Sequence, residues 1–307
     1  MQVETGETGT AADVDRRWQA LEGQPFAAEG APEQTPVNEA MIRHWTDVFG
    51  GPADHGYTGA PPPMLMAWTM RGYAATSGAV ASDEERALDC LRTETGVTGI
   101  LATDLTHRYE RELRLGETIT RTDVVESVSS PKETAVGRGW FVNYQQTFTD
   151  EARLVVGVQR VRVLHYRPGP DVRPPRRPSP VDVGNVRYEL RVPVTTSLVV
   201  AGALATRDFN PVHHDRDHAR AGGVDDVYVN IYTHLGFCHR LVSEWPGPDV
   251  RLRGLEVRLA LPSLPGDDLV YRAHAVDPRS VRIAITAVSA RGVHVVGAAD
   301  LDCSAAS

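Results

Sequence analysis

The chain has 307 residues, of which 41% are hydrophobic and 23% are charged, as in ordinary globular proteins. Its 32 Lys and Arg residues against 40 Asp and Glu residues give a net charge of −8, which argues against a nucleic-acid partner. No apolar run approaches the ~20 residues that span a bilayer, and the N-terminus has no signal-peptide pattern. Three widely separated cysteines exclude a disulfide framework, so we expect a cytoplasmic protein without a membrane partner.

Two stretches of unusual composition divide the chain. Residues 1–35 are acidic and rich in Gly, Ala, Glu and Thr, which predicts a mobile arm with one short helix over Ala12–Leu21. Residues 167–185 contain six prolines within thirteen positions, which excludes a helix or a central strand and indicates a semi-rigid linker. The linker separates a first block, residues 36–166, from a second block, residues 186–303.

The two blocks contain the same kinds of elements in the same order. Each begins with an apolar segment, strand-like in the second block: Val37–Phe49 and Thr195–Ala205. Each continues with one strong predicted helix: from Pro62 to about Gly78, and Tyr228–Trp245. Each ends with alternating strands: Thr106–Leu113, Thr118–Ser127, Gly139–Thr149 and Arg153–His165, then Arg253–Leu261, Asp268–Val276, Ser280–Ala290 and Val293–Cys303.

The repeated order predicts two copies of one α+β unit, each a long helix wrapped by an antiparallel sheet. Comparable turns around Gly116 and Gly266, 150 residues apart, support the repeat. We expect the two sheets to join into one extended antiparallel sheet, with both helices on one face.

The residues best suited to chemistry lie in the second block, in the run Asp208-Phe209-Asn210-Pro211-Val212-His213. Asn-Pro marks a turn and bars Asn210 from helical geometry. A rigid turn can point Asp208 and His213 into one space, where a carboxylate and a neutral imidazole that share a water form an acid/base pair. The alternative is a surface loop with ordinary charged residues.

His214 and His218 have the spacing of a zinc-binding helix, but the residues around them are polar throughout. A short solvated helix capped near Asp215 explains them better. We therefore predict no metal.

The run from Ser197 to Trp245 resembles the MaoC-like hydratase/dehydratase family, through the hydratase 2 signature D-x-N-P-[LIV]-H-x-D. The resemblance covers about residues 36–303, with a strong motif in the second block and a weak one in the first. It implies a tandem hotdog fold and a hydro-lyase acting on a 2-enoyl or 3-hydroxyacyl thioester of coenzyme A or an acyl carrier. The variant resembles the actinobacterial acyl-CoA hydratases of sterol side-chain breakdown, which implies a bulky acyl group.

Asp208 and His213 match the catalytic pair of that family. The resemblance implies that Asn210 orients the turn. Asn230 and Ile231 stand where many members have His-Gly, and their backbone N–H groups are expected near the thioester oxygen. Three further residues are assigned to the acyl pocket, with helix-core packing as the alternative: Met64, Trp68 and Tyr232. The first block lacks the motif, apart from an Asp54-His55 remnant or plain loop, and is expected to be a non-catalytic partner that shapes the tunnel.

Two other functions stay open: a non-catalytic or partner-dependent hotdog subunit that binds acyl thioesters, and a polyketide-pathway dehydratase or cyclase. A hotdog thioesterase is disfavoured, because the helix from Tyr228 to Arg240 carries no Asp or Glu. We expect no cofactor other than coenzyme A as part of the substrate. The expected assembly is a homodimer or a hetero-oligomer with another hotdog or OB-type subunit.

Overall fold

A computed structural model describes residues 10–25, 35–50, 59–73, 83–169, 188–244, 251–275 and 282–302. Most of the predicted linker, the Asp54-His55 pair, Trp245 and Cys303 lie outside these ranges. No helix among the described residues is both long enough and apolar enough to cross a membrane.

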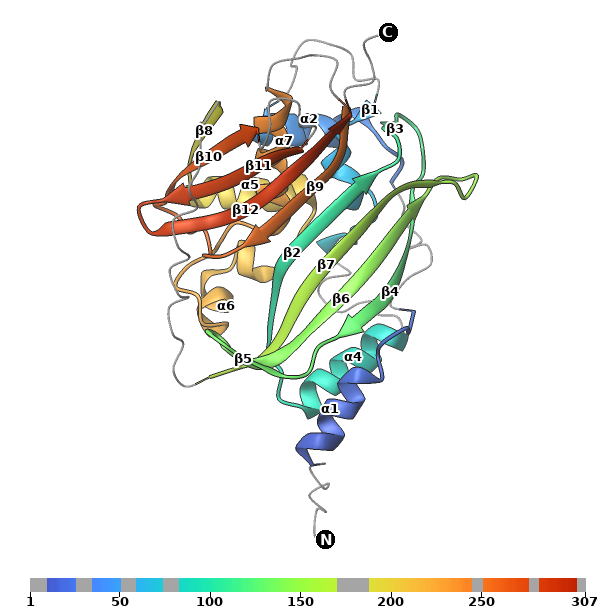
Figure 1. Cartoon of the computed structure of the whole chain (residues 1–307), viewed down its shortest axis with the longest axis vertical. Coiled ribbons are helices and arrows are strands. Elements are labelled where there is room, and N and C mark those ends of the chain that lie inside the picture. The colour runs from blue at the N-terminus through green and yellow to red at the C-terminus, as the bar shows by residue number, and fades with distance from the viewer. Residues whose placement is uncertain are drawn as a thin grey trace.

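One large antiparallel sheet runs through both blocks, as predicted (Figure 1). The strands follow the order β4-β6-β7-β2-β9-β12-β11-β10-β8, with β5 paired to β6 and a separate small pair β1-β3. The strands of the first block are β1 (Gly59–Ala60), β2 (Gly99–Tyr109), β3 (Leu113–Arg114), β4 (Thr120–Val128), β5 (Lys132–Thr134), β6 (Gly137–Thr149) and β7 (Val155–Pro168). Those of the second block are β8 (Tyr188–Pro193), β9 (Arg251–Leu259), β10 (Asp268–Ala275), β11 (Arg282–Ser289) and β12 (Gly292–Asp302). The blocks meet where β2 pairs with β9, with Leu105 opposite Val257.

The described helices are divided between the part of the chain before the linker and the part after it. They are α1 (Ala11–Gln19), α2 (Glu39–Phe49), η1 (Pro62–Met66), α4 (Asp83–Glu94), α5 (Thr196–Thr206), η2 (Pro211–His213), α6 (Arg216–Ala221) and α7 (Ile231–Ser243). Helix α7 packs against β8, β9, β10 and β2, and α2 and α5 lie beside it behind the sheet in Figure 1. The two blocks therefore share one hydrophobic core, which contains Trp45, Phe148, Leu235 and Tyr271.

Equivalent backbone bonds tie each block together at its predicted turn. Gly116 and Gly266 both have positive φ, 84° and 99°. The Gly116 N–H donates to the Val37 carbonyl at 2.8 Å, and the Gly266 N–H donates to the Val194 carbonyl at 2.9 Å. In each case the acceptor precedes a capped helix, α2 or α5. The internal repeat read from the sequence is thus present in the backbone.

Close approaches at two glycines fix α7 in place. A Cβ on Gly202 of α5 would lie 2.3 Å from the Thr233 hydroxyl oxygen, and a Cβ on Gly236 would lie 2.7 Å from the Phe49 ring. Only glycine permits these distances, so α5 and α2 both pack directly on α7. The first turn of α7 is consequently held beside the C-terminal end of α5, where Asp208 follows.

Two element predictions were wrong. The described part of the segment from Pro62 toward Gly78 is a short 3₁₀ helix, η1, and residues 70–72 are not helical. Among the described residues of this block, α4 is the longest helix. The segment Thr195–Ala205 is α-helical, not strand-like, because Thr195 caps it by accepting from the Leu198 N–H and its alanines favour helix.

The prediction of a mobile arm does not hold for residues 10–25. Helix α1 begins with a capping box at Thr10 and Asp13. Trp18 is fully buried and stacks on Trp140 of β6, with ring centroids 5.0 Å apart and planes 7° from parallel. A second apolar cluster, which includes Leu88 of α4, surrounds this pair.

Candidate active site

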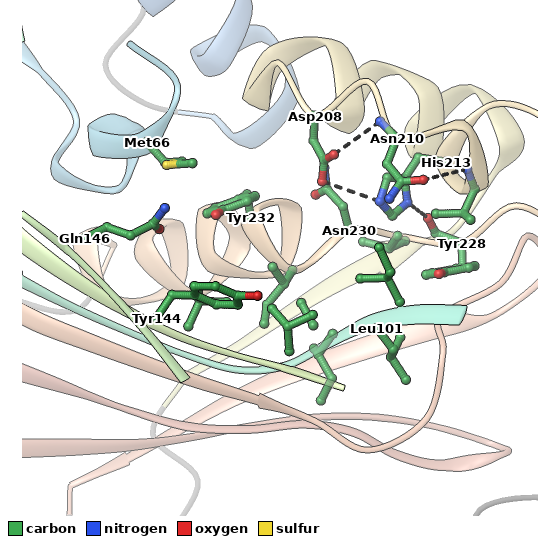
Figure 2. A pocket seen from close by; sticks show the side chains of 18 of the residues that line it. Met66, Leu101, Tyr144, Gln146, Asp208, Asn210, His213, Tyr228, Asn230 and Tyr232 are labelled. Carbon is green, nitrogen blue, oxygen red and sulfur yellow. Dashed lines mark hydrogen bonds and ion pairs between the residues drawn. The ribbon is translucent and has the colours of Figure 1, made fainter. Parts of the chain in front are cut away.

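The turn after α5 places Asp208 and His213 face to face. Arg207 ends α5 in the left-handed conformation, with φ 58°, and the Asp208 N–H donates to the Ala203 carbonyl at 2.9 Å. The Asn210 side chain caps η2 by accepting from the Val212 N–H at 3.3 Å. Its backbone N–H donates to Asp208 Oδ1, also at 3.3 Å. Asp208 Oδ2 then lies 3.4 Å from His213 Nε2 (Figure 2).

A backbone carbonyl sets the tautomer of His213. Its Nδ1 lies 2.7 Å from the Tyr228 carbonyl oxygen, which can only accept, so Nδ1 carries the proton. The lone pair of a neutral ring is therefore on Nε2, facing the Asp208 carboxylate. Two acceptors that face each other require a shared donor, and a water that donates to both satisfies this geometry. His213 is only 6% exposed, so such a water would be held away from bulk solvent.

The charge on Asp208 is stabilised by its neighbours. Burial alone would raise the pKa of this carboxyl, whereas the positive charge and the Nε2–H hydrogen bond of a protonated His213 lower it. Hydrogen bonds from the Asn210 backbone and the Asn230 side chain act in the same direction, so the pKa of Asp208 lies below its usual value. Asp208 is thus an ionised base at neutral pH.

Asn230 has more contacts than the sequence indicated. Its Oδ1 accepts from the Thr233 N–H at 2.6 Å and caps α7, and its Nδ2 donates to the Thr206 hydroxyl at 2.8 Å. The same amide also helps to lower the pKa of Asp208, so it acts on both the helix cap and the carboxylate. Asn230 therefore connects the end of α5, which leads into the Asp208–His213 turn, to the start of α7.

The backbone at the start of α7 supplies donors. The N–H groups of Ile231 and Tyr232 have no acceptor among the described residues, since the cap side chain reaches only the third residue of the helix. Both residues border the cavity beside Asp208 and His213. The missing glycine leaves these donors in place, and they suit an oxygen that gains negative charge.

A cavity of about 260 Å³ lies between the catalytic turn and the sheet of the first block. Asp208, Asn210, His213, Asn230, Ile231 and Tyr232 line it, so six of the predicted site residues meet there. The predicted Met64 and Trp68 do not line it. They are 0% and 3% exposed and belong to the hydrophobic core, because the segment that carries them turns as a short 3₁₀ helix. Met66 lines the cavity instead.

The sequence reading missed the polar residues that the first block contributes. Asp123 lines the cavity from β4, and Tyr144 and Gln146 line it from β6. Figure 2 shows Tyr144 and Gln146 on the side away from His213. The available signal was an inward-facing polar residue in the alternating pattern of β6, whose even-numbered positions from Trp140 to Phe148 are buried.

The other histidines and the cysteine of this region are not arranged as a second site. His214 and His218 are exposed, and Asp215 caps α6 between them. Within the described ranges there is no group of three or more metal-ligating side chains. Cys238 is fully buried on α7, and burial raises its pKa to about 12, which leaves it a core residue.

The second block matches a known protein family. Residues 183–297 match the model of the MaoC like domain. The chain is 39% identical over 172 residues to a probable enoyl-CoA hydratase alpha subunit of Thermomonospora curvata, a match over 51% of this chain and 53% of that protein. The match therefore spans about half of that relative's length.

A smaller relative is matched almost completely. The 3-oxo-4,17-pregnadiene-20-carboxyl-CoA hydratase beta subunit of Mycobacterium tuberculosis is 36% identical over 121 residues, which are 39% of this chain and 94% of that protein. A solved Mycobacterium tuberculosis protein described as a double hotdog fold superposes with a TM-score of 0.53 at 16% identity, over 92% of this chain and 96% of that one. The fold is thus a double hotdog, and the chain belongs to the MaoC-like hydratase/dehydratase family.

Proposed function

We propose that the protein is a hydro-lyase that adds water to a 2-enoyl thioester, or removes it from the 3-hydroxyacyl thioester. The observation that carries the proposal is the Asp208–His213 pair, 3.4 Å apart, beside a cavity bordered by two available N–H groups of α7. Relatives named as enoyl-CoA hydratase and pregnadiene-carboxyl-CoA hydratase subunits support it.

The geometry suggests how the residues of this chain divide the reaction. A water held between Asp208 Oδ2 and His213 Nε2 loses a proton to the pair as its oxygen bonds to Cβ. The electrons of the double bond move toward the thioester oxygen, which accepts from the N–H groups of Ile231 and Tyr232. The pair then delivers a proton to Cα, so the elements of one water are added and no other reactant is consumed. Asn210 and Asn230 position Asp208 without touching the reacting atoms.

The test is hydration of an enoyl-CoA by Asp208→Asn and His213→Ala. Each single variant is expected to lower kcat by ~10² or more, since one positioned acid or base contributes ~10²–10⁴. The double variant is expected to lose far less than the product of the two, because the pair acts on one water. Hydration close to wild type by either single variant, with the fold confirmed by circular dichroism, would remove that residue from the mechanism.

The proposed substrate is a bulky, ring-bearing or branched acyl-CoA. Support comes from the steroid thioester in the name of the mycobacterial relative and from the wall that the non-catalytic first block adds to the cavity. We expect kcat/KM to rise from crotonyl-CoA to larger enoyl-CoAs, because each further buried CH₂ contributes ~0.8 kcal/mol at best. Crotonyl-CoA as the best substrate, with no reaction or competition by ring-bearing thioesters, would contradict this assignment.

The relatives are named as alpha and beta subunits of heteromeric hydratases. On that ground we propose that this chain also assembles with another hotdog subunit. The measurement is the mass of the native complex purified through a tag on this chain. A complex that contains only this chain would contradict the proposal and leave the homodimer.

A further inference from the structure

A line of buried polar side chains joins the first block to the start of α7. It starts at an Arg121–Asp123 pair on β4 and passes through Gln146 on β6 and Gln159 on β7 to the Tyr232 hydroxyl. A branch from Gln159 reaches His107 and Tyr109 on β2. The side chains of the first block lie far in sequence from the Asp208–His213 turn. Asp123 and Gln146 nevertheless border the same cavity as Tyr232.

The Arg121–Asp123 ion pair at one end determines which group of each following side chain donates and which accepts. Arg121 Nε lies 2.8 Å from Asp123 Oδ1, which keeps the carboxylate ionised and therefore able only to accept. The neighbouring Gln146 donates its Nε2 to Asp123 Oδ2 at 2.9 Å. The Gln146 amide is thereby oriented, and its Oε1 must face the next residue, Gln159.

The orientation is passed on through Gln159. Because Gln146 presents an oxygen, Gln159 must present its Nε2, and the two are hydrogen-bonded. The second hydrogen of the same Nε2 is donated to the Tyr232 hydroxyl oxygen at 3.1 Å. Gln159 Oε1 then accepts from His107 Nε2 at 2.5 Å, which leaves His107 Nδ1 to accept from the Tyr109 hydroxyl at 2.9 Å. Every donor meets an acceptor with no conflict along the branch.

The hydroxyl proton of Tyr232 has no acceptor along this line of side chains. Its hydroxyl oxygen already accepts from Gln159, so its O–H must donate elsewhere, and no acceptor for it lies among the described residues. Figure 2 shows this hydroxyl on the Gln146 side of the cavity, away from Asp208 and His213. Because Tyr232 borders the cavity, a ligand held there can supply the acceptor that this O–H lacks. A buried hydroxyl without an acceptor costs free energy unless a ligand supplies one.

We propose that the Tyr232 hydroxyl, oriented by the first block, binds an acceptor oxygen on the acyl group remote from the thioester, a ring carbonyl or hydroxyl. The inference rests on the proposed function in that the cavity is taken to hold an acyl thioester. It assigns a task to the non-catalytic block: selection of oxygenated acyl groups over plain hydrocarbon ones. A site built to hydrogen-bond an oxygen discriminates against the analogue that lacks it, since the donor is then left unpaired.

The test is binding, which is independent of turnover. Three saturated thioesters that cannot be hydrated are titrated calorimetrically into the full chain: cyclohexylpropanoyl-CoA, its ring ketone and its ring alcohol. We expect wild type to bind the ketone, the alcohol or both about tenfold more tightly than the hydrocarbon. Tighter binding of the ketone alone identifies a carbonyl ligand, and tighter binding of the alcohol alone identifies a hydroxyl.

The variants separate a ligand contact from a structural role. Tyr232→Phe is expected to abolish the preference by weakening the oxygenated ligands only. Asp123→Asn is expected to reduce it, because an amide can present either a donor or an acceptor to Gln146 and the direction is lost. Tyr271→Phe is the matched control: this buried tyrosine bonds His234 and does not line the cavity, so the preference should persist.

Equal binding of all three thioesters by wild type overturns the inference. Equal weakening of all three by Tyr232→Phe also overturns it, since the donor would then serve the thioester that the ligands share. An undiminished preference in folded Asp123→Asn would overturn the role of the first block. Hydration of enoyl-CoAs by wild type together with any of these results leaves the proposed function standing, whereas failure to bind any thioester removes both.

Discussion

Replacing Asn230 by alanine is the perturbation whose cost the structure specifies most closely. The variant loses the cap bond to the Thr233 N–H, and capping residues contribute about 1 kcal/mol. It also loses the amide that helps to lower the pKa of the buried Asp208 carboxyl, and a hydrogen bond to a charged group contributes about 1.5–3 kcal/mol. Thr206 keeps its bond to the Gly202 carbonyl and adds little. The expected loss in free energy of unfolding is therefore about 2.5–4 kcal/mol.

Asn38 provides a matched control. It caps α2 by accepting from the Met41 N–H at 3.0 Å, and its Nδ2 donates to the exposed Pro36 carbonyl at 2.8 Å, not to a carboxylate. Asn38→Ala should therefore lose the cap and one exposed hydrogen bond, and the cap contributes about 1 kcal/mol. Urea unfolding at pH 7, followed by circular dichroism, measures both variants under the same conditions.

A double-mutant cycle with Asp208→Ala isolates the bond between Asn230 and Asp208. We expect a coupling free energy of about 2 kcal/mol, because removing either partner already removes the interaction. The folded pKa of Asp208 is lowered, so this stabilisation is present above its unfolded pKa and is lost as the pH falls through the folded value. A cost for Asn230→Ala no larger than that for Asn38→Ala, or an unchanged cost in the Asp208→Ala background, would refute the reasoning.

Three further predictions concern packing and metal content. Gly202→Ala should destabilise the protein by about 1–3 kcal/mol and lower activity, because the new methyl group would push α5 away from Thr233 and α7. Gly169→Ala, where the nearest atom would be 3.6 Å from the new Cβ, should do neither in thermal unfolding and hydration assays. Trp18→Ala should lower the free energy of unfolding, measured in urea, by about 3–5 kcal/mol, because it removes the ring that stacks on Trp140. The kcat should stay near wild type. An unchanged stability would show that α1 contributes nothing to the fold. The purified protein should contain no stoichiometric zinc, and a chelator should not reduce hydration; elemental analysis giving about one zinc per chain would contradict this.

Local patterns in the sequence were sufficient to predict much of the sheet and the turn that contains Asp208 and His213. Period-two alternation located β4, β6 and β7 and all four strands after α7 to within a few residues, because each strand has one face on a shared core. The Asn-Pro turn indicated that Asp208 and His213 would converge, since that geometry is local and set by the four residues between them.

Local patterns failed where the same composition suits two conformations. The apolar run after Thr195 fits a buried strand or a buried helix equally; the structure shows a helix, in which Gly202 packs against Thr233. The proline at Pro62 is compatible with an α-helix start, yet the chain turns as η1 and places Met66, not Met64, in the cavity. Trp18 gave no indication of its partner, because the stack on Trp140 joins residues 122 positions apart.

The polar side of the cavity was decided only by tertiary structure. Alternation in β4 and β6 shows that Asp123 and Gln146 point inward, but not what they meet. The pairing of β2 with β9 joins the two blocks into one sheet and brings these side chains to Tyr232 of α7. The sequence by itself thus determined which residues can do acid/base chemistry. The closure of the two blocks around one core decided which groups share their cavity, since hydrogen bonds between distant segments form only once the sheet has fixed their separation.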